Sequence, residues 1–261
     1  DKEHKPKIKV PELHYWETHS SAKNWHLFLE ASLDIEEVYY KDFHIPEAEV
    51  SITLELPDEL ELPKITLKTP KGDINAKAAF NFTGIPYCSF LVNETEAPID
   101  FIQLLKSFNK DWEGILDQLK IDEETKLQCN GIFKFDDQAD IQINGNMLSK
   151  ELQFRNLTIK NANCNWSLNA ERIFWKISEA EFLDADIKTS GYYDLQTSSG
   201  QSLFSVKNLP LKKAEELVLN DEKAKNKNEL KGSISVDCKI EFFKDWAAHP
   251  TYLEGNGHLK L

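Results

Sequence analysis

The segment Val50-Ser51-Ile52-Thr53-Leu54-Glu55-Leu56 places a hydrophobic residue at every second position. Successive side chains of a β-strand point to opposite faces of a sheet, so this alternation predicts a strand with one apolar and one polar face. The pattern recurs, and we predict further strands at 62–69, 73–82, 131–135, 139–145, 151–160, 171–177, 180–188, 191–195 and 232–242. Short polar segments separate these strands, as is typical of an antiparallel meander.

Two stretches have helical periodicity instead. Hydrophobic residues recur at intervals of three and four between Pro98 and Leu119, interrupted near Asn109, and again between Leu211 and Leu219. Pro98 suits the first turn of a helix, where its missing N–H has no helical acceptor. Both stretches predict short amphipathic helices, each following a group of strands.

Segments of the first half reappear in the second half in the same order. Leu33-Asp34-Ile35, Ala48–Ile52 and Ile65–Ile74 resemble 157–159, 170–173 and 185–191, at nearly constant spacing. Such repeats stack and bury a shared face. We therefore predict a mainly β fold with a few short helices. We expect this fold to be a long curved antiparallel meander built from repeated strand-rich units, each followed by an amphipathic helix. The predicted parts are a tail and lead-in strand at 1–26, units at 27–122 and 123–228, and a third unit beginning at 229–261.

Composition narrows the function classes. The chain has 261 residues, 41% hydrophobic and 29% charged, as in globular domains. Its longest apolar runs, such as Phe90-Leu91-Val92, have three residues, whereas a membrane-spanning helix needs about 18. The 44 acidic residues outnumber 31 basic ones, and only Arg155 and Arg172 are arginines. Because phosphate binding requires clustered basic residues, we expect no nucleic-acid partner.

No motif for catalysis or for a bound metal or cofactor is present. The chain has neither a G-x-S-x-G segment nor a phosphate-binding glycine loop. His14, Glu17, His19 and His26 lie close in sequence, but their spacing matches neither a helix face nor a strand face. Adjacent acids such as Glu36-Glu37 are typical of solvated turns rather than of a general acid and base flanking a substrate. We therefore expect no enzyme activity, cofactor or metal.

The four cysteines also follow no metal-binding pattern. Two disulfides and four buried free thiols are both compatible with the spacing of Cys88, Cys129, Cys164 and Cys238.

The alternating strands do suggest a binding face. An apolar sheet face must contact a core, a helix or a hydrophobic ligand, because its exposure to water is unfavourable. A lipid tail suits such a face, since its binding needs no polar motif. The residues that we predict to form an apolar groove or core face are Ile52, Leu54, Ile65, Leu67, Ile173 and Trp175.

Several segments resemble a known family. Ile187–Leu195, the continuation Phe204–Leu211 before a predicted helix, and the preceding Leu168–Trp175 are similar to the AsmA-like bacterial envelope proteins, over residues 27–261. The resemblance implies a repeating β-groove in the periplasm that carries phospholipid toward the outer membrane. It also implies an inner-membrane anchor, which we expect to lie outside this chain, and no catalytic residues.

We therefore expect a non-enzymatic envelope protein that handles lipid or assists outer-membrane assembly, with a phospholipid or another acyl-chain ligand as its partner. The alternative is a secreted β-sandwich module for adhesion or carbohydrate binding.

Overall fold

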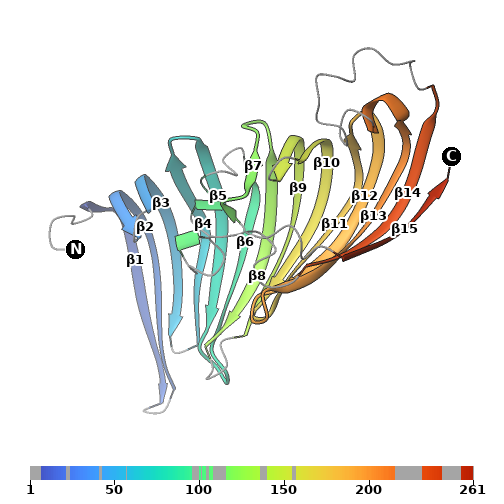
Figure 1. Cartoon of the computed structure of the whole chain (residues 1–261). Coiled ribbons are helices and arrows are strands. Elements are labelled where there is room, and N and C mark those ends of the chain that lie inside the picture. The colour runs from blue at the N-terminus through green and yellow to red at the C-terminus, as the bar shows by residue number, and fades with distance from the viewer. Residues whose placement is uncertain are drawn as a thin grey trace. The chain divides into compact units, whose positions relative to one another are not determined.

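The computed structural model consists almost entirely of antiparallel β-strands (Figure 1). It describes residues 7–21, 24–40, 43–56, 58–95, 100, 102–103, 106–107, 116–135, 140–154, 157–214, 231–242 and 254–260. The prediction of a mainly β fold is confirmed. The chain divides into two compact units, Asp1–Asn146 and Met147–Leu261.

The first unit is a meander in which β1 to β6 each pair antiparallel with the next strand, and β6 pairs with β8. The short strand β7 lies outside this path. The strands of this unit are β1 (Lys7–Ser21), β2 (Asn24–Tyr40), β3 (Phe43–Leu56), β4 (Glu59–Thr69), β5 (Gly72–Asn81), β6 (Tyr87–Thr95), β7 (Leu119–Ile121), β8 (Lys126–Lys134) and the beginning of β9 (Ile141–Phe154).

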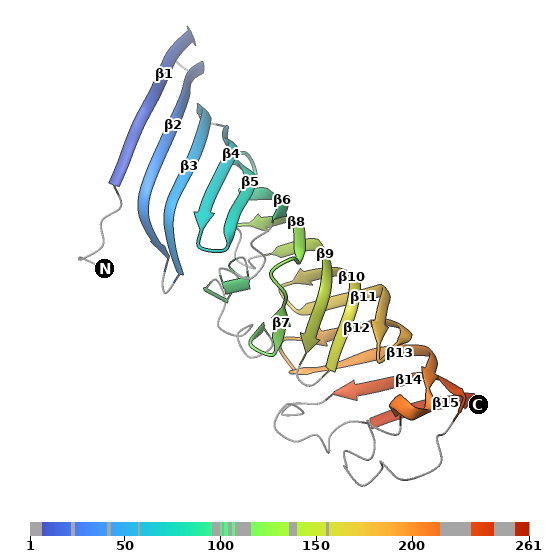
Figure 2. The ribbon, with the colours of Figure 1, turned by 90° about the horizontal axis from the view of Figure 1, so that it is seen from above.

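The second unit has the same construction (Figure 2). From β10 to β15, each strand pairs antiparallel with the strand that follows it in sequence. Its strands are the remainder of β9, β10 (Leu157–Asn169), β11 (Arg172–Phe182), β12 (Ala185–Asp194), β13 (Ser199–Pro210), β14 (Ser233–Phe242) and β15 (Glu254–Lys260). The predicted meander is therefore found in each unit.

The predicted ending of each unit in an amphipathic helix is not supported. Between residues 98 and 119, the helical described residues are 100, 102–103, 106–107 and 116, and Leu119 belongs to β7. In the second stretch, residues 211–214 are helical and 215–219 lie outside the described residues. Strand pairing, rather than a strand-plus-helix repeat, therefore organises the described chain.

Bulges interrupt the simple alternation of several strands. In β6, β10 and β11 the pairing register shifts near buried residues that are three positions apart: Val92 and Thr95, Ile159 and Ala162, Ile177 and Ala180. A bulge inserts one extra residue, so both members of such a pair point to the same face. The register of β4 shifts between Leu62 and Ile65 around Pro63, which has no N–H to donate to a neighbouring strand.

Candidate functional site

The strand register places four of the predicted residues on one face of the first unit. Residues directly opposed in an antiparallel pair share a face. Leu54 opposes Leu29 in β2 and Leu60 in β4, and Ile65 opposes Val50 in β3 and Ala76 in β5. Ile52 and Leu67 lie two residues from Leu54 and Ile65 and therefore share their face.

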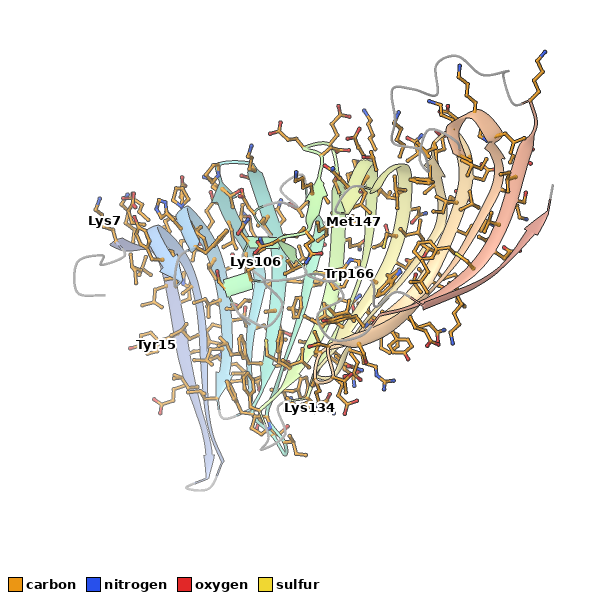
Figure 3. The ribbon with its side chains drawn as sticks, in the orientation of Figure 1. Lys7, Tyr15, Lys106, Lys134, Met147 and Trp166 are labelled. Atoms are coloured by element: carbon orange, nitrogen blue, oxygen red, sulfur yellow. The ribbon has the colours of Figure 1, made fainter. Side chains whose placement is uncertain are left out.

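Two rows of apolar side chains cross this face from β2 to β8. We call their members the apolar face of the first unit: Leu29, Leu54, Leu60, Phe80, Cys88 and Phe133 in one row, and Leu33, Val50, Ile65, Ala76, Val92 and Cys129 in the other. Leu54 and Ile65 remain half-buried. On the neighbouring strand β1, Leu13 is 56% exposed and Tyr15 is 72% exposed (Figure 3). This face therefore offers apolar surface to a ligand.

The opposite face of the same strands carries charge. Lys64 Nζ lies 3.1 Å from Glu49 Oε2, and Lys68 Nζ lies 2.6 Å from Glu47 Oε1 and 3.0 Å from Glu49 Oε1. Hydrogen bonds from Lys68 and Lys64 lower the pKa of Glu49, and hydrogen bonds to Glu47 and Glu49 raise that of Lys68. In β3 and β4 the first unit thus has one apolar face and one charged face.

In the second unit, Ile173 and Trp175 likewise share a face. Ile173 opposes Leu168 and Tyr193, and Trp175 opposes Trp166 and Gly191. The next row along this face is Cys164, Ile177, Thr189, Phe204 and Cys238. The structure therefore places the six predicted residues in two sets, four in the first unit and two in the second. All six are half-buried.

Thr189 in β12 and Ser202 in β13 are buried polar residues among apolar neighbours, and their hydroxyl groups hydrogen-bond to each other. The hydroxyl oxygens of Thr189 and Ser202 lie 3.0 Å apart, and both side chains are buried. Because the two hydroxyls bond to each other, the pair is tolerated in apolar surroundings. It adds no group that would recognise a polar ligand.

All four cysteines are free thiols. Cys88 and Cys129 lie on the apolar face of the first unit, and Cys164 and Cys238 share a row in the second. Burial raises the pKa of Cys129 to about 12 and that of Cys164 to about 11. Since the thiolate is the reactive form, these cysteines act as small apolar side chains rather than nucleophiles.

A hollow of about 640 Å³ lies against β11 to β14 in the second unit. It is lined by Ile177, Thr189, Phe204 and Cys238 together with the residues on either side of each along its strand. Among these neighbours are Lys176, Lys188 and Lys239. The volume is in the range of small-ligand sites. Its lining combines an apolar row with amines and hydroxyls.

No metal-binding cluster is found among the residues that the structure describes. They contain no group of three or more histidine, cysteine or carboxylate side chains that could hold a metal ion. Of the histidines near the N-terminus, His14 lies on β1 opposite Glu30, whereas the side chains of His19 and His26 lie outside the described ones. None of the described helices is long and apolar enough to cross a membrane.

A comparison of the chain with protein-family models, curated proteins and solved structures finds no match. The candidate site therefore rests on its own geometry.

One exposed apolar surface was not predicted from the sequence. Phe82, Ile85 and Phe135 are exposed at one end of the first unit. Phe82 and Phe135 were expected to be the last residues of the strands predicted at 73–82 and 131–135, but they lie just beyond β5 and β8. The signal that was available is the segment Phe80–Tyr87, which contains no charged residue.

Proposed function

We propose that this chain is a non-enzymatic lipid-handling protein of the bacterial envelope, and that the apolar face of its first unit binds acyl chains. The observation that carries the proposal is the pair of apolar rows on one side of the sheet. Their members in β2 to β5 remain half-buried, and the other side of β3 and β4 is charged. In β3 this division follows directly from the alternation of Val50, Ile52 and Leu54 with Ser51 and Thr53.

The chemistry of the face favours an acyl chain. Its rows consist of aliphatic, aromatic and thiol side chains, which offer burial but few directional hydrogen bonds. Each methylene group moved from water onto such a surface contributes about 0.8 kcal/mol when fully buried. A long hydrocarbon chain therefore gains affinity along its whole length without a specific polar partner.

A β-sandwich for adhesion or carbohydrate binding is supported less well. Such a fold buries the apolar face of one sheet against a second sheet. In each unit the described strands belong to one sheet, in which each strand pairs with its neighbour along the meander. An apolar ligand takes the place of the second sheet in our proposal. The periplasmic location, a membrane anchor outside this chain and a role in outer-membrane assembly rest on the resemblance to AsmA-like proteins.

Native mass spectrometry after incubation with phospholipid tests the proposal. We expect a protein–lipid complex with the unaltered chain and at least a tenfold loss of bound lipid for Ile52→Asp, because a carboxylate on the apolar face opposes burial of hydrocarbon. The matched control is Ser51→Asp, which places the same charge one residue away on the opposite face, where lipid binding is expected to be unchanged. Equal lipid binding by Ile52→Asp and Ser51→Asp would exclude this face as the site.

A further inference from the structure

Four large hydrophobic side chains gather at one end of the first unit. Phe82 and Ile85, in the loop between β5 and β6, are 45% and 58% exposed, and Tyr87 at the start of β6 is 37% exposed. Phe135, which follows β8, is 58% exposed, and its backbone N–H donates to the carbonyl of Pro86 over 2.8 Å. This bond joins the end of β8 to the loop, near Lys134 in Figure 3. We call Phe82, Ile85, Tyr87 and Phe135 the apolar loop end.

The backbone N–H groups of Phe82 and Thr83 in this loop are hydrogen-bonded. The N–H of Phe82 donates to the carbonyl of Asp58 over 2.9 Å. The N–H and hydroxyl of Thr83 both donate to Asn81 Oδ1, over 3.0 and 2.6 Å. Gly84 has a φ of +66°, which completes the turn at little steric cost. These bonds fix the loop and allow it to enter a water-poor environment without leaving these amide donors unpaired.

The charge around the apolar loop end indicates which kind of partner surface, neutral or anionic, it would bind. Phe80–Tyr87 has no charged side chain, and Lys134 is paired with Asp140 over 2.8 Å. The chain as a whole has a net charge of −13, so an anionic surface repels it. Aromatic side chains with a polar tip, such as Tyr87, suit the boundary between water and lipid.

We propose that the apolar loop end docks onto a lipid bilayer with electrically neutral headgroups. The size of the patch favours a bilayer over a protein. A stable protein interface covers about 800 Å² on each partner, whereas four partly exposed large side chains offer on the order of 400 Å². Shallow insertion of loop side chains into lipid needs no matching surface. This docking goes beyond acyl-chain binding and does not require it.

Flotation of the 261-residue chain with phosphatidylcholine vesicles tests the docking. We expect the unaltered chain to float with the vesicles, and the double variant Phe82→Ser/Ile85→Ser to lose at least tenfold in partitioning. Vesicles containing phosphatidylglycerol are expected to bind the unaltered chain less well, because of the negative net charge. The matched control is Phe174→Ser/Leu203→Ser, which removes two exposed hydrophobic side chains of the second unit and is expected to float normally.

The proposal is overturned if the unaltered chain does not float with phosphatidylcholine vesicles, or if the loop variant floats equally well. It is also overturned if sedimentation shows a dimer that the loop variant abolishes while flotation is absent, because the loop end then contacts a second copy. The native mass spectra of the loop variant separate this question from acyl-chain binding. They are expected to retain bound phospholipid, since Phe82 and Ile85 are not members of the two apolar rows.

Discussion

The indole of Trp175 in β11 lies over Gly191 in β12, its direct partner in the strand register. A Cβ atom at Gly191 would lie 2.5 Å from Cζ2 of the indole and would also collide with the carbonyl oxygen of Gln201. Phe90 has the same relationship to its partner Gly131 in the first unit. In both units an aromatic ring covers the space that a glycine leaves open on the sheet.

We predict that Gly191→Ala lowers the free energy of unfolding by about 1–3 kcal/mol, the usual range for overpacking. The measurement is urea denaturation. Ser190→Ala, one residue away, is the control and is expected to change stability by less than about 0.5 kcal/mol. In Trp175→Leu/Gly191→Ala part of the Gly191→Ala cost persists, because the carbonyl of Gln201 stays in place. Unchanged stability of Gly191→Ala would show that the ring and strand move apart freely.

The buried hydroxyl pair gives a second prediction. Thr189→Val leaves the hydroxyl of Ser202, which is 1% exposed, without the partner it has at 3.0 Å. An unsatisfied buried polar group costs about 1–3 kcal/mol, and we expect that loss in urea denaturation. Thr189→Val/Ser202→Ala removes both hydroxyls and is expected to recover much of the loss. A double variant less stable than either single variant would contradict mutual satisfaction of the pair.

The free thiols should differ in reactivity. Burial raises the pKa of Cys129 to about 12, and Cys129 is 1% exposed, whereas Cys238 is only partly buried. With a thiol reagent at mildly alkaline pH, we expect Cys238 to react first and Cys129 to react only after unfolding. Peptide mapping of the modified chain identifies the order. Modification of Cys129 as fast as Cys238 would show that this part of the apolar face opens readily.

We predict that Asp194 contributes to the loss of folding stability at acidic pH. Its Oδ1 accepts hydrogen bonds from the N–H and hydroxyl of Thr197, and its Oδ2 lies 3.1 Å from Nε of Arg172. Bonds from Thr197, then from Arg172, hold the pKa of Asp194 below the ordinary 3.8. The stabilisation is therefore present above the ordinary pKa and is lost as pH falls through the lower pKa of the folded state.

We expect Asp194→Asn to lower Tm at neutral pH and to reduce the fall of Tm on acidification. Thermal unfolding followed by circular dichroism, from neutral pH to below the ordinary pKa of Asp194, measures both effects. If the variant and the unaltered chain lose stability in parallel on acidification, Asp194 does not contribute to the acid response.

The two faces of the regular strands could be predicted from the sequence, whereas some strands and the bulges could not. Alternation from Val50 to Leu56 was enough to predict the strand and its two faces, because each side chain there has a simple period of two. The strand β6 was missed, since Phe90-Leu91-Val92 is a continuous apolar run without alternation. Bulges at Pro63 and near Asn161 shift the period to three, and only the paired strands reveal which face a residue then occupies.

The predicted groove residues show the same limit. Alternation grouped Ile173 with Trp175 and Ile52 with Leu54. In the register, the two residues of each pair lie two positions apart on one strand and share a face. Alternation did not show that Trp175 lies over Gly191, because a close approach between neighbouring strands depends on their register. The apolar loop end was also missed, since the hydrogen bond from Phe135 N–H to the carbonyl of Pro86, which joins β8 to the loop, cannot be read from the sequence.

Photo-crosslinking from single positions of β3 tests acyl-chain binding most directly. A benzophenone amino acid replaces Leu54 on the apolar face or Thr53 on the opposite face, and the protein is irradiated with phospholipid. We predict a covalent phospholipid adduct from position 54 and little or none from position 53, because only the first side chain lies among the apolar rows. Equal adducts from both positions, or none from position 54, would contradict the proposal that this face binds lipid.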